Sequence, residues 1–333
     1  MSGPAPLPPA AGDPAPGGAR PWFSPIVRGR LEALLAAFLF AASVPVNKVL
    51  LRDIPPVALS AVIYLAVGVF SLSLALLSRR GRGPADPPAP SRDLALADWP
   101  YLAGGVATGS LFAPLALLFG MQRTSGHAAG LLLNFEVVFT VGLGVLFSGE
   151  RLGRRGWLGG AAIWLGALLV SWPGAEPGTA TGAHGAGALL ILGACALWGA
   201  DNNITLRISH KDATQIVAVK GLVGGVFSLA LALALGQTGG WTLARLGAAV
   251  LVGADTYGLT IVLFVRSMRA IGVVQTGLYF AMAPGMAAIL AWLFLREPAT
   301  LAGLTALGVM TAGALLLATD PHHHPRDGGP TPA

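Results

Sequence analysis

Long apolar runs alternate with short polar or basic breaks over most of the chain. An α-helix needs roughly 20 apolar residues to cross the hydrocarbon core of a bilayer. Ten runs meet this requirement: residues 31–51, 56–78, 99–120, 127–148, 156–173, 186–206, 213–235, 245–265, 273–295 and 299–318. The pattern therefore predicts an all-α integral membrane protein with ten transmembrane helices.

One predicted span ends in an unusually polar stretch, "WGADNNITLR", residues 198–207. Unpaired polar groups are costly in hydrocarbon, and charged groups inside spans usually face the bundle interior or a water-filled cavity. Asp201, Asn202 and Asn203 are therefore not expected to face lipid. We expect this stretch to line a polar cavity inside the bundle.

Composition agrees with a membrane protein. Of 333 residues, 54% are hydrophobic and only 11% are charged, whereas a soluble domain carries about 25% charged residues. The net charge of +6 does not indicate a nucleic-acid partner, because the basic residues lie in short scattered clusters between the apolar runs. Cys195 is the only cysteine, which excludes an intrachain disulfide and a CxxC metal site.

Both ends of the chain lie outside the predicted helical body. Residues 1–27 are dominated by Pro, Gly and Ala and are predicted to form a disordered tail. Residues 319–333 form a second tail, "TDPHHHPRDGGPTPA", with three adjacent histidines. Adjacent histidines lack the spacing of a closed tetrahedral site, so no metal site is predicted there.

Basic residues are distributed unequally between the breaks. With the N-terminus inside, fifteen Lys and Arg residues fall on the cytoplasmic side and five fall outside. This asymmetry follows the positive-inside rule. We therefore expect a multi-pass protein of the cytoplasmic (inner) membrane with both termini in the cytoplasm.

The chain also contains an internal repeat. Similar residues recur in the same order in both halves: "GVFSL" at 68–72 and 225–229, and, at an offset of 147, Gly130 with Gly277, Glu150 with Glu297, and "GALLV" from Gly166 with "GALLL" from Gly313. Residues 28–173 and 174–318 are thus predicted to be two copies of a five-helix unit. Because five is odd, the second copy enters the membrane from the opposite side, as in transporters built from inverted repeats.

These segments resemble a known family. "LLLNFEVVFTVGLGVLFSGERLGRRGWLGGAAIWLGALLVSW" resembles the signature half of EamA-type permeases of the drug/metabolite transporter superfamily. "LWGADNNITLRIS" and "LYFAMAPGMAAILAWLFLREP" are similar to one branch whose members often end in a His-rich tail. The resemblance covers roughly residues 31–318. It implies a ten-helix fold and secondary transport of small organic solutes, mostly export, without naming a substrate.

Ionisable residues inside the predicted spans are the strongest candidates for a functional site. They are Lys48, Glu136, Asp201, Lys220 and Asp255. On insertion scales, each charge near the bilayer centre costs roughly 2.5 to 3.5 kcal/mol, so such residues are usually paired or face a cavity. An Asp201–Lys220 pair that only fixes helix register is the structural alternative to solute or proton binding.

Helical spacing groups further polar residues with these charges. Asp201 and Thr205 lie one turn apart with Asn202 beside them, whereas Asn134 and Glu136 cannot face the same direction. Tyr257 and Tyr279 offer hydroxyls to a solute or, alternatively, to neighbouring backbone groups. The candidate substrate- or proton-binding residues are Glu136, Asp201, Asn202, Thr205, Lys220, Asn134, Asp255, Tyr257 and Tyr279.

The sequence therefore predicts a proton-linked secondary transporter that moves a small organic solute across the bilayer, with export favoured. Glu136 or Asp201 is expected to exchange a proton for solute as the cavity switches sides. No P-loop, GxSxG or HExxH motif occurs, so neither an enzyme nor a cofactor is predicted. Two alternatives stay open: efflux of a divalent metal ion with the histidine tail as collector, and a membrane scaffold or lipid-modifying enzyme. A homodimer is also left open.

Overall fold

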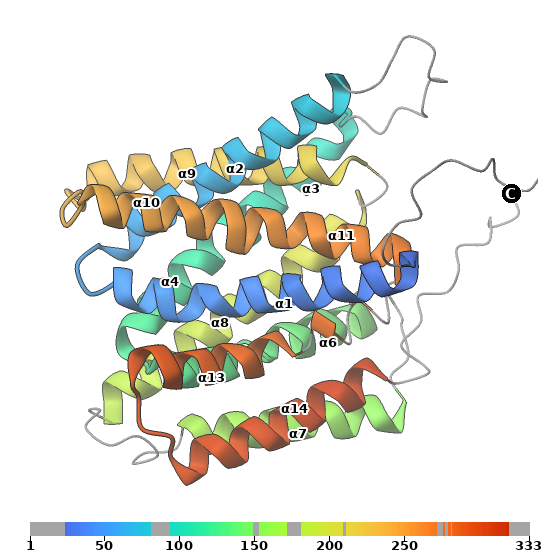
Figure 1. Ribbon diagram of the computed structural model, residues 1–333, viewed down its shortest axis with the longest axis vertical. Coiled ribbons are helices and arrows are strands. Elements are labelled where there is room, and N and C mark those ends of the chain that lie inside the picture. The colour runs from blue at the N-terminus through green and yellow to red at the C-terminus, as the bar shows by residue number, and fades with distance from the viewer. Residues whose placement is uncertain are drawn as a thin grey trace, which may run out of the picture.

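The computed structural model describes residues 24–80, 94–148, 153–171, 181–208, 211–271, 276, 279–280 and 282–319. Every regular element within these ranges is helical (Figure 1). Seven helical segments are long and apolar enough to cross a membrane, and two further apolar helices are shorter. The fold is thus that of a multi-pass integral membrane protein. Glu150 and the tail histidines lie outside the described residues.

The described helices follow the order of the apolar runs. The first half contains α1 (Pro25–Leu50), α2 (Pro56–Arg80), η1 (Leu96–Asp98), α3 (Trp99–Gly105), α4 (Ala113–Arg123), α5 (Gly126–Leu132), α6 (Phe135–Ser148) and α7 (Arg154–Ser171). The second half contains α8 (Thr181–Leu206), α9 (Ala213–Ala234), α10 (Leu243–Leu251), α11 (Thr260–Ile271), α13 (Ala283–Leu295) and α14 (Leu301–Ala318). Helix α1 begins at Pro25, before the predicted start at residue 31, because the Ser24 hydroxyl caps it by accepting a hydrogen bond from the Val27 N–H.

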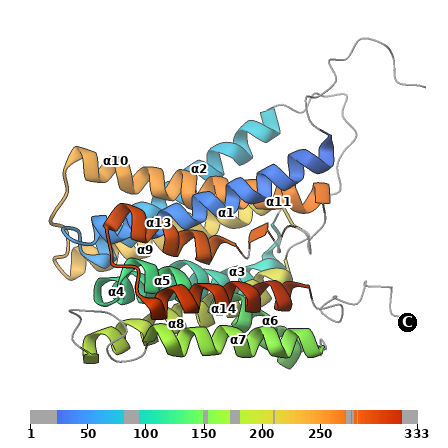
Figure 2. The ribbon, with the colours of Figure 1, turned by 60° about the horizontal axis from the view of Figure 1, so that its bottom comes forward.

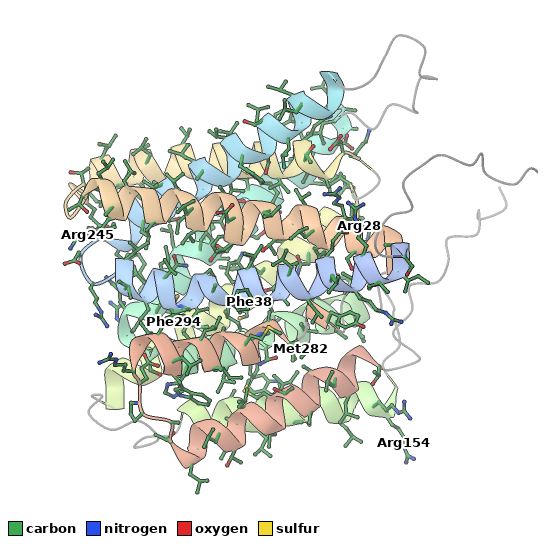
Figure 3. The ribbon with its side chains drawn as sticks, in the orientation of Figure 1. Arg28, Phe38, Arg154, Arg245, Met282 and Phe294 are labelled. Carbon is green, nitrogen blue, oxygen red and sulfur yellow. The ribbon has the colours of Figure 1, made fainter. Side chains whose placement is uncertain are left out.

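The long helices run roughly side by side in both ribbon views (Figure 1, Figure 2). Arg28 and Arg154 lie at one end of this bundle and Arg245 lies at the other (Figure 3). We name these the Arg28 end, where α1 begins, and the Arg245 end, where α1 finishes. Large apolar side chains such as Phe38 and Phe294 are exposed between the two ends. Such an apolar surface on a helical bundle is expected where lipid surrounds it.

Glycines bring two pairs of helices into close contact at the edges of the bundle. Helix α2 packs along α9, and α7 packs along α14 (Figure 2). A Cβ atom added to Gly221 would lie 2.6 Å from the backbone N of Gly68. Helices in lipid associate through such small residues, because apolar side chains alone gain little over acyl chains.

Most of the remaining helices form two sets, which we name walls. The first wall consists of α1, α11 and α13 with the π-helix η3 (Val252–Leu259). The second wall consists of α8, α4 and the broken helix α5–α6 with the π-helix η2 (Val106–Phe112). Each wall therefore combines helices from both halves of the sequence.

The π-helical segments interrupt corresponding spans. Segment η2 begins at Val106 and η3 at Val252, an offset of 252 − 106 = 146 residues. In each segment a threonine hydroxyl donates to the carbonyl four residues earlier, Thr108 to Gly104 at 2.8 Å and Thr256 to Val252 at 2.5 Å. Such back-bonding competes with the regular helical ladder, and π-segments are frequent at functional sites.

Candidate functional site

Asp201 and Lys220 form a buried ion pair between α8 and α9. The Lys220 Nζ donates to both Asp201 carboxylate oxygens, at 2.5 and 2.6 Å, and to Thr205 Oγ1 at 3.3 Å. The Thr205 hydroxyl in turn donates to Asp201 Oδ1 at 3.0 Å. An ammonium group has three N–H donors, so these contacts use the full capacity of Lys220. The predicted pairing of these two side chains is present, and Thr205 belongs to it.

The π-segment η2 closes over this pair. A Cβ at Gly109 would overlap the Asp201 carboxylate, so only glycine admits the acid there. The Gly109 carbonyl cannot receive a π-helical hydrogen bond from Pro114, which has no N–H. Two side chains donate to it instead, Tyr64 Oη at 3.1 Å and Trp198 Nε1 at 3.0 Å. The irregular backbone is therefore satisfied from α2 and α8.

Glu136 is a carboxylate without a cationic partner among the described residues. It lies in the first turn of α6, directly after the break between α5 and α6. Asn202 Nδ2 donates to Glu136 Oε1 at 3.2 Å and to Thr140 Oγ1 at 3.1 Å. Glu136 is half-buried and Asn202 is exposed, so neither side chain is sealed inside the bundle.

Two other asparagines, Asn134 and Asn203, donate hydrogen bonds to backbone carbonyl groups. Asn134 is buried and donates to the Leu131 carbonyl at 2.9 Å, within the break that precedes α6. Asn203 donates to the Thr140 and Gly199 carbonyls at 3.0 and 2.8 Å, which fastens α8 to α6. Neither of these two side chains hydrogen-bonds to Glu136.

The remaining candidates lie in or near the first wall. Tyr257 in η3 accepts a hydrogen bond from Asn47 of α1 at 3.4 Å. Asp255 is half-buried and makes no side-chain hydrogen bond or ion pair with the part of the chain that the structure describes. Tyr279 is half-buried before α13; its backbone carbonyl accepts a hydrogen bond from the Met282 N–H at 3.2 Å, and its side chain makes none to a described residue.

Four half-buried aromatic rings form a cluster on the side of the first wall and α2. The ring centroids of Phe40 and Tyr257 are 6.0 Å apart, those of Tyr64 and Tyr257 are 6.4 Å apart, and those of Phe40 and Phe280 are 5.5 Å apart. The hydroxyls of both tyrosines are engaged, by Gly109 and Asn47. The rings of Phe40, Tyr64 and Tyr257 also pack against the buried apolar core, while each side chain stays partly exposed.

Hydrogen bonds join the two walls at the Arg245 end. Lys48 of α1 donates to the carbonyls of Met121 and Thr124, where α4 finishes. Favourable contact of a cation with the last carbonyls of a helix is expected from the helix dipole. Lys48 thus has a structural partner away from the central acids.

Glu297, between α13 and α14, caps the start of α5. It accepts hydrogen bonds from the N–H groups of Gly126 and His127, at 2.7 and 2.9 Å, and from His127 Nδ1 at 2.9 Å. Burial raises the pKa of the Glu297 carboxyl, but these hydrogen bonds outweigh burial, so the pKa lies below its ordinary value. At the Arg28 end, the carboxylate of Glu32 instead pairs with Arg28 and Arg266, all within the first wall.

Sequence reasoning missed several residues at the centre. Tyr64, Asn47, Trp198 and Gly109 were not among the candidates, although each contacts one of them or shares their hydrogen-bond network. The available signal was a tyrosine and an asparagine inside otherwise apolar spans. Nothing in the sequence marks Gly109, because its role is to leave room for Asp201 of α8, a helix distant in sequence. No group of three His, Cys, Asp or Glu side chains able to hold a metal occurs among the described residues.

Known proteins resemble this chain over most of its length. The sequence model of the EamA-like transporter family matches residues 27–172 and 185–319. An uncharacterized transporter of Methanothermobacter thermautotrophicus is 28% identical over 301 residues, covering 87% of this chain and 85% of that protein. One protein crystal structure matches with a TM-score of 0.60 at 18% identity, over 87% of this chain and 96% of the other. That last similarity concerns the fold alone.

Proposed function

The chain belongs to the EamA-like transporter family, and from this premise we propose that it is a proton-linked secondary transporter that exports a small organic metabolite across the cytoplasmic membrane. The two ranges matched by the family model correspond closely to the two predicted halves, residues 28–173 and 174–318. The equivalent π-segments η2 and η3 support the same duplication into inverted five-helix units. Arg28 and Arg154 at one end favour that end as the cytoplasmic one (Figure 3).

The observation that carries the proposal is the state of Glu136. Its carboxylate is half-buried, accepts a hydrogen bond from Asn202, and has no cation beside it among the described residues. Such a group binds a proton or a polar part of a solute, and the arrival of one displaces the other. Asp201 is assigned the different role of a fixed pair with Lys220, because its charge is already neutralised.

Asn202, Asn134 and Tyr257 are assigned positioning or lining roles in the same site. Asn202 orients the Glu136 carboxylate, and Asn134 fixes the break from which α6 begins. Tyr257 is assigned a lining role because its half-buried ring packs with those of Phe40 and Tyr64. Asp255 and Tyr279, for which no such contact supports a direct role, are retained as secondary candidates.

Alternating access follows from the placement of the wall-to-wall contacts. Lys48 and Glu297 hold the walls together at the Arg245 end, whereas the exposed Asn202 lies four residues before α8 finishes at the Arg28 end. We assign this conformation as open toward the Arg28 end. In the opposite state the contacts of Lys48 and Glu297 separate and the walls meet at the Arg28 end.

Flux in proteoliposomes tests this function. Vesicles that contain the full chain and an internal pH dye receive a panel of small metabolites under an imposed proton gradient. Solute movement is expected to be coupled to proton movement in the opposite direction. Glu136→Gln is expected to abolish the proton movement while solute-for-solute exchange persists, because a neutral amide binds solute without releasing a proton.

The matched control is Asp53→Asn, which removes a half-exposed carboxylate paired with Arg245 at the end of the bundle. This variant is expected to move protons like the unmodified chain. Retention of full pH dependence by Glu136→Gln would contradict the proposed coupling.

A further inference from the structure

Charge balance at the centre of the bundle restricts what the site can accept. Lys220 is fully engaged by Asp201 and Thr205. Lys48 is committed to the carbonyls at the end of α4. Among the described central residues, Glu136 and Asp255 are left as acids without an opposite partner, and of the two only Glu136 has a side-chain hydrogen bond that orients it.

An anionic solute finds no receptor in this arrangement. It would have to displace Asp201 from Lys220, which would leave a buried carboxylate without its cation. The start of α6 is a positive dipole end, but Glu136 itself occupies that first turn. Helix α13 begins with Pro284 near its start, which removes one of the free N–H donors that an anion would use.

The aromatic cluster supplies the complementary feature. Phe40, Tyr64, Tyr257 and Phe280 are half-buried, and the hydroxyls of the two tyrosines are already engaged. A cation placed over an aromatic face is attracted by the electron density of the ring, most strongly where water is excluded. The geometry connects the rings and the Glu136 carboxylate through neighbouring residues. Tyr64 donates to the Gly109 carbonyl, and Gly109 packs against the Asp201 carboxylate. Asn202, next to Asp201 in the chain, donates to Glu136.

We propose that the transported solute is a small organic cation, an ammonium group with an apolar body, with the ammonium on Glu136 and the body against the aromatic cluster. This inference rests on the proposed function and adds the substrate class to it. Charge balances in the exchange: one positive charge arrives at the carboxylate, and one proton leaves it for water. The exchange is then electroneutral.

Binding of phenyltrimethylammonium to the purified full chain in detergent tests the substrate class. This probe has a permanent charge and no ionisable proton, so any proton released on binding comes from the protein. Phenylacetate and phenylalanine serve as anionic and zwitterionic probes of similar size. Calorimetry in weakly buffered solution is expected to show binding of the cation alone, with release of protons to the buffer.

Variants separate the carboxylate from the rings. Glu136→Gln is expected to weaken binding of the cation by about tenfold or more and to abolish proton release, whereas Glu136→Asp retains both in part. Tyr257→Leu is expected to weaken binding several-fold while proton release per bound cation is unchanged. Asp53→Asn is the carboxylate control and is expected to bind as the unmodified chain does.

Three outcomes would overturn the assignment: preference for phenylacetate or phenylalanine, unchanged cation binding in Glu136→Gln, or loss of binding through Asp255→Asn instead. If the cation does not bind while proton-coupled flux of another solute still depends on Glu136, the substrate class is refuted and the proposed function stands. If proton-coupled flux does not depend on Glu136, the proposed function itself is refuted.

Discussion

A charged residue deep in a membrane protein is tolerated only with its partner, and Lys220 and Asp201 show this dependence. Both side chains are largely buried, and their contact is short at 2.5 Å. Removal of one partner of a buried pair leaves an uncompensated charge, which typically costs 3–5 kcal/mol. Neutral replacement of both partners is often far less costly.

We therefore expect Lys220→Met to lower the free energy of unfolding by about 3 kcal/mol. The double variant Lys220→Met with Asp201→Asn is expected to recover most of this loss. Unfolding of the detergent-solubilised variants by denaturant provides the measurement. A double variant no more stable than Lys220→Met alone would mean that the pair is not the source of the effect.

The position of Asp201 also restricts which residue can occupy position 109. A methyl group there would overlap the carboxylate, and the backbone of η2 cannot withdraw while Tyr64 and Trp198 hold its carbonyl. Gly109→Ala is expected to destabilise the protein by about 1–3 kcal/mol, the usual range for overpacking.

Gly193→Ala is the matched control, because a Cβ on this α8 glycine meets open space. In a helix interior, alanine is favoured over glycine by roughly 0.5–1 kcal/mol, so the control should be neutral or slightly stabilising. Equal melting temperatures for the two alanine variants would argue against the close packing of Asp201 on η2.

At the scale of elements, the contact between Glu297 and the start of α5 links stability to pH. The folded-state pKa of Glu297 is depressed, so the ionised form is favoured by folding. Its stabilising contribution is complete above the unfolded-state pKa and is lost as the pH falls through the folded-state pKa. Hydrogen bonds to a charged group at a partly buried helix start contribute about 2 kcal/mol.

Glu297→Gln is therefore expected to be less stable than the unmodified chain near neutral pH, and the difference should shrink in acid. Melting temperatures of both proteins over a pH series measure this convergence. A stability difference that stays constant down to strongly acidic pH would show that the charge of Glu297 is not what caps α5.

Hydropathy predicted the elements well, because each span must be apolar along its own length. The described helices follow the predicted runs, and the Asp201–Lys220 contact was among the expected pairs. The π-segments were not predicted, since a Thr four residues after a carbonyl occurs in many regular helices. The contact of Asn202 with Glu136 was also missed, because the register between two helices depends on packing rather than on either sequence alone.

At the scale of the whole molecule, the two halves cross over to build each wall. Helix α1 packs against η3, α11 and α13 of the second half, and α8 packs against η2, α4 and α6 of the first. In the proposed transport cycle, a movement of one wall relative to the other is expected to open one end as it closes the other. At the repeat offset of 147 residues, Glu136 corresponds to Ala283, so the second half has no equivalent acid there.

The most direct test is to measure both ends of the bundle at once. Spin labels replace the exposed Arg52 and Arg123 at the Arg245 end in one protein, and the exposed Arg207 and Arg266 at the Arg28 end in another, both with Cys195→Ala. Pulsed electron spin resonance then reports each inter-wall distance as the pH is changed and cation is added. Alternating access predicts opposite changes, with the Arg245-end distance lengthening as the Arg28-end distance shortens. Distances that stay fixed under all conditions, or that change in the same direction at both ends, would contradict alternating access.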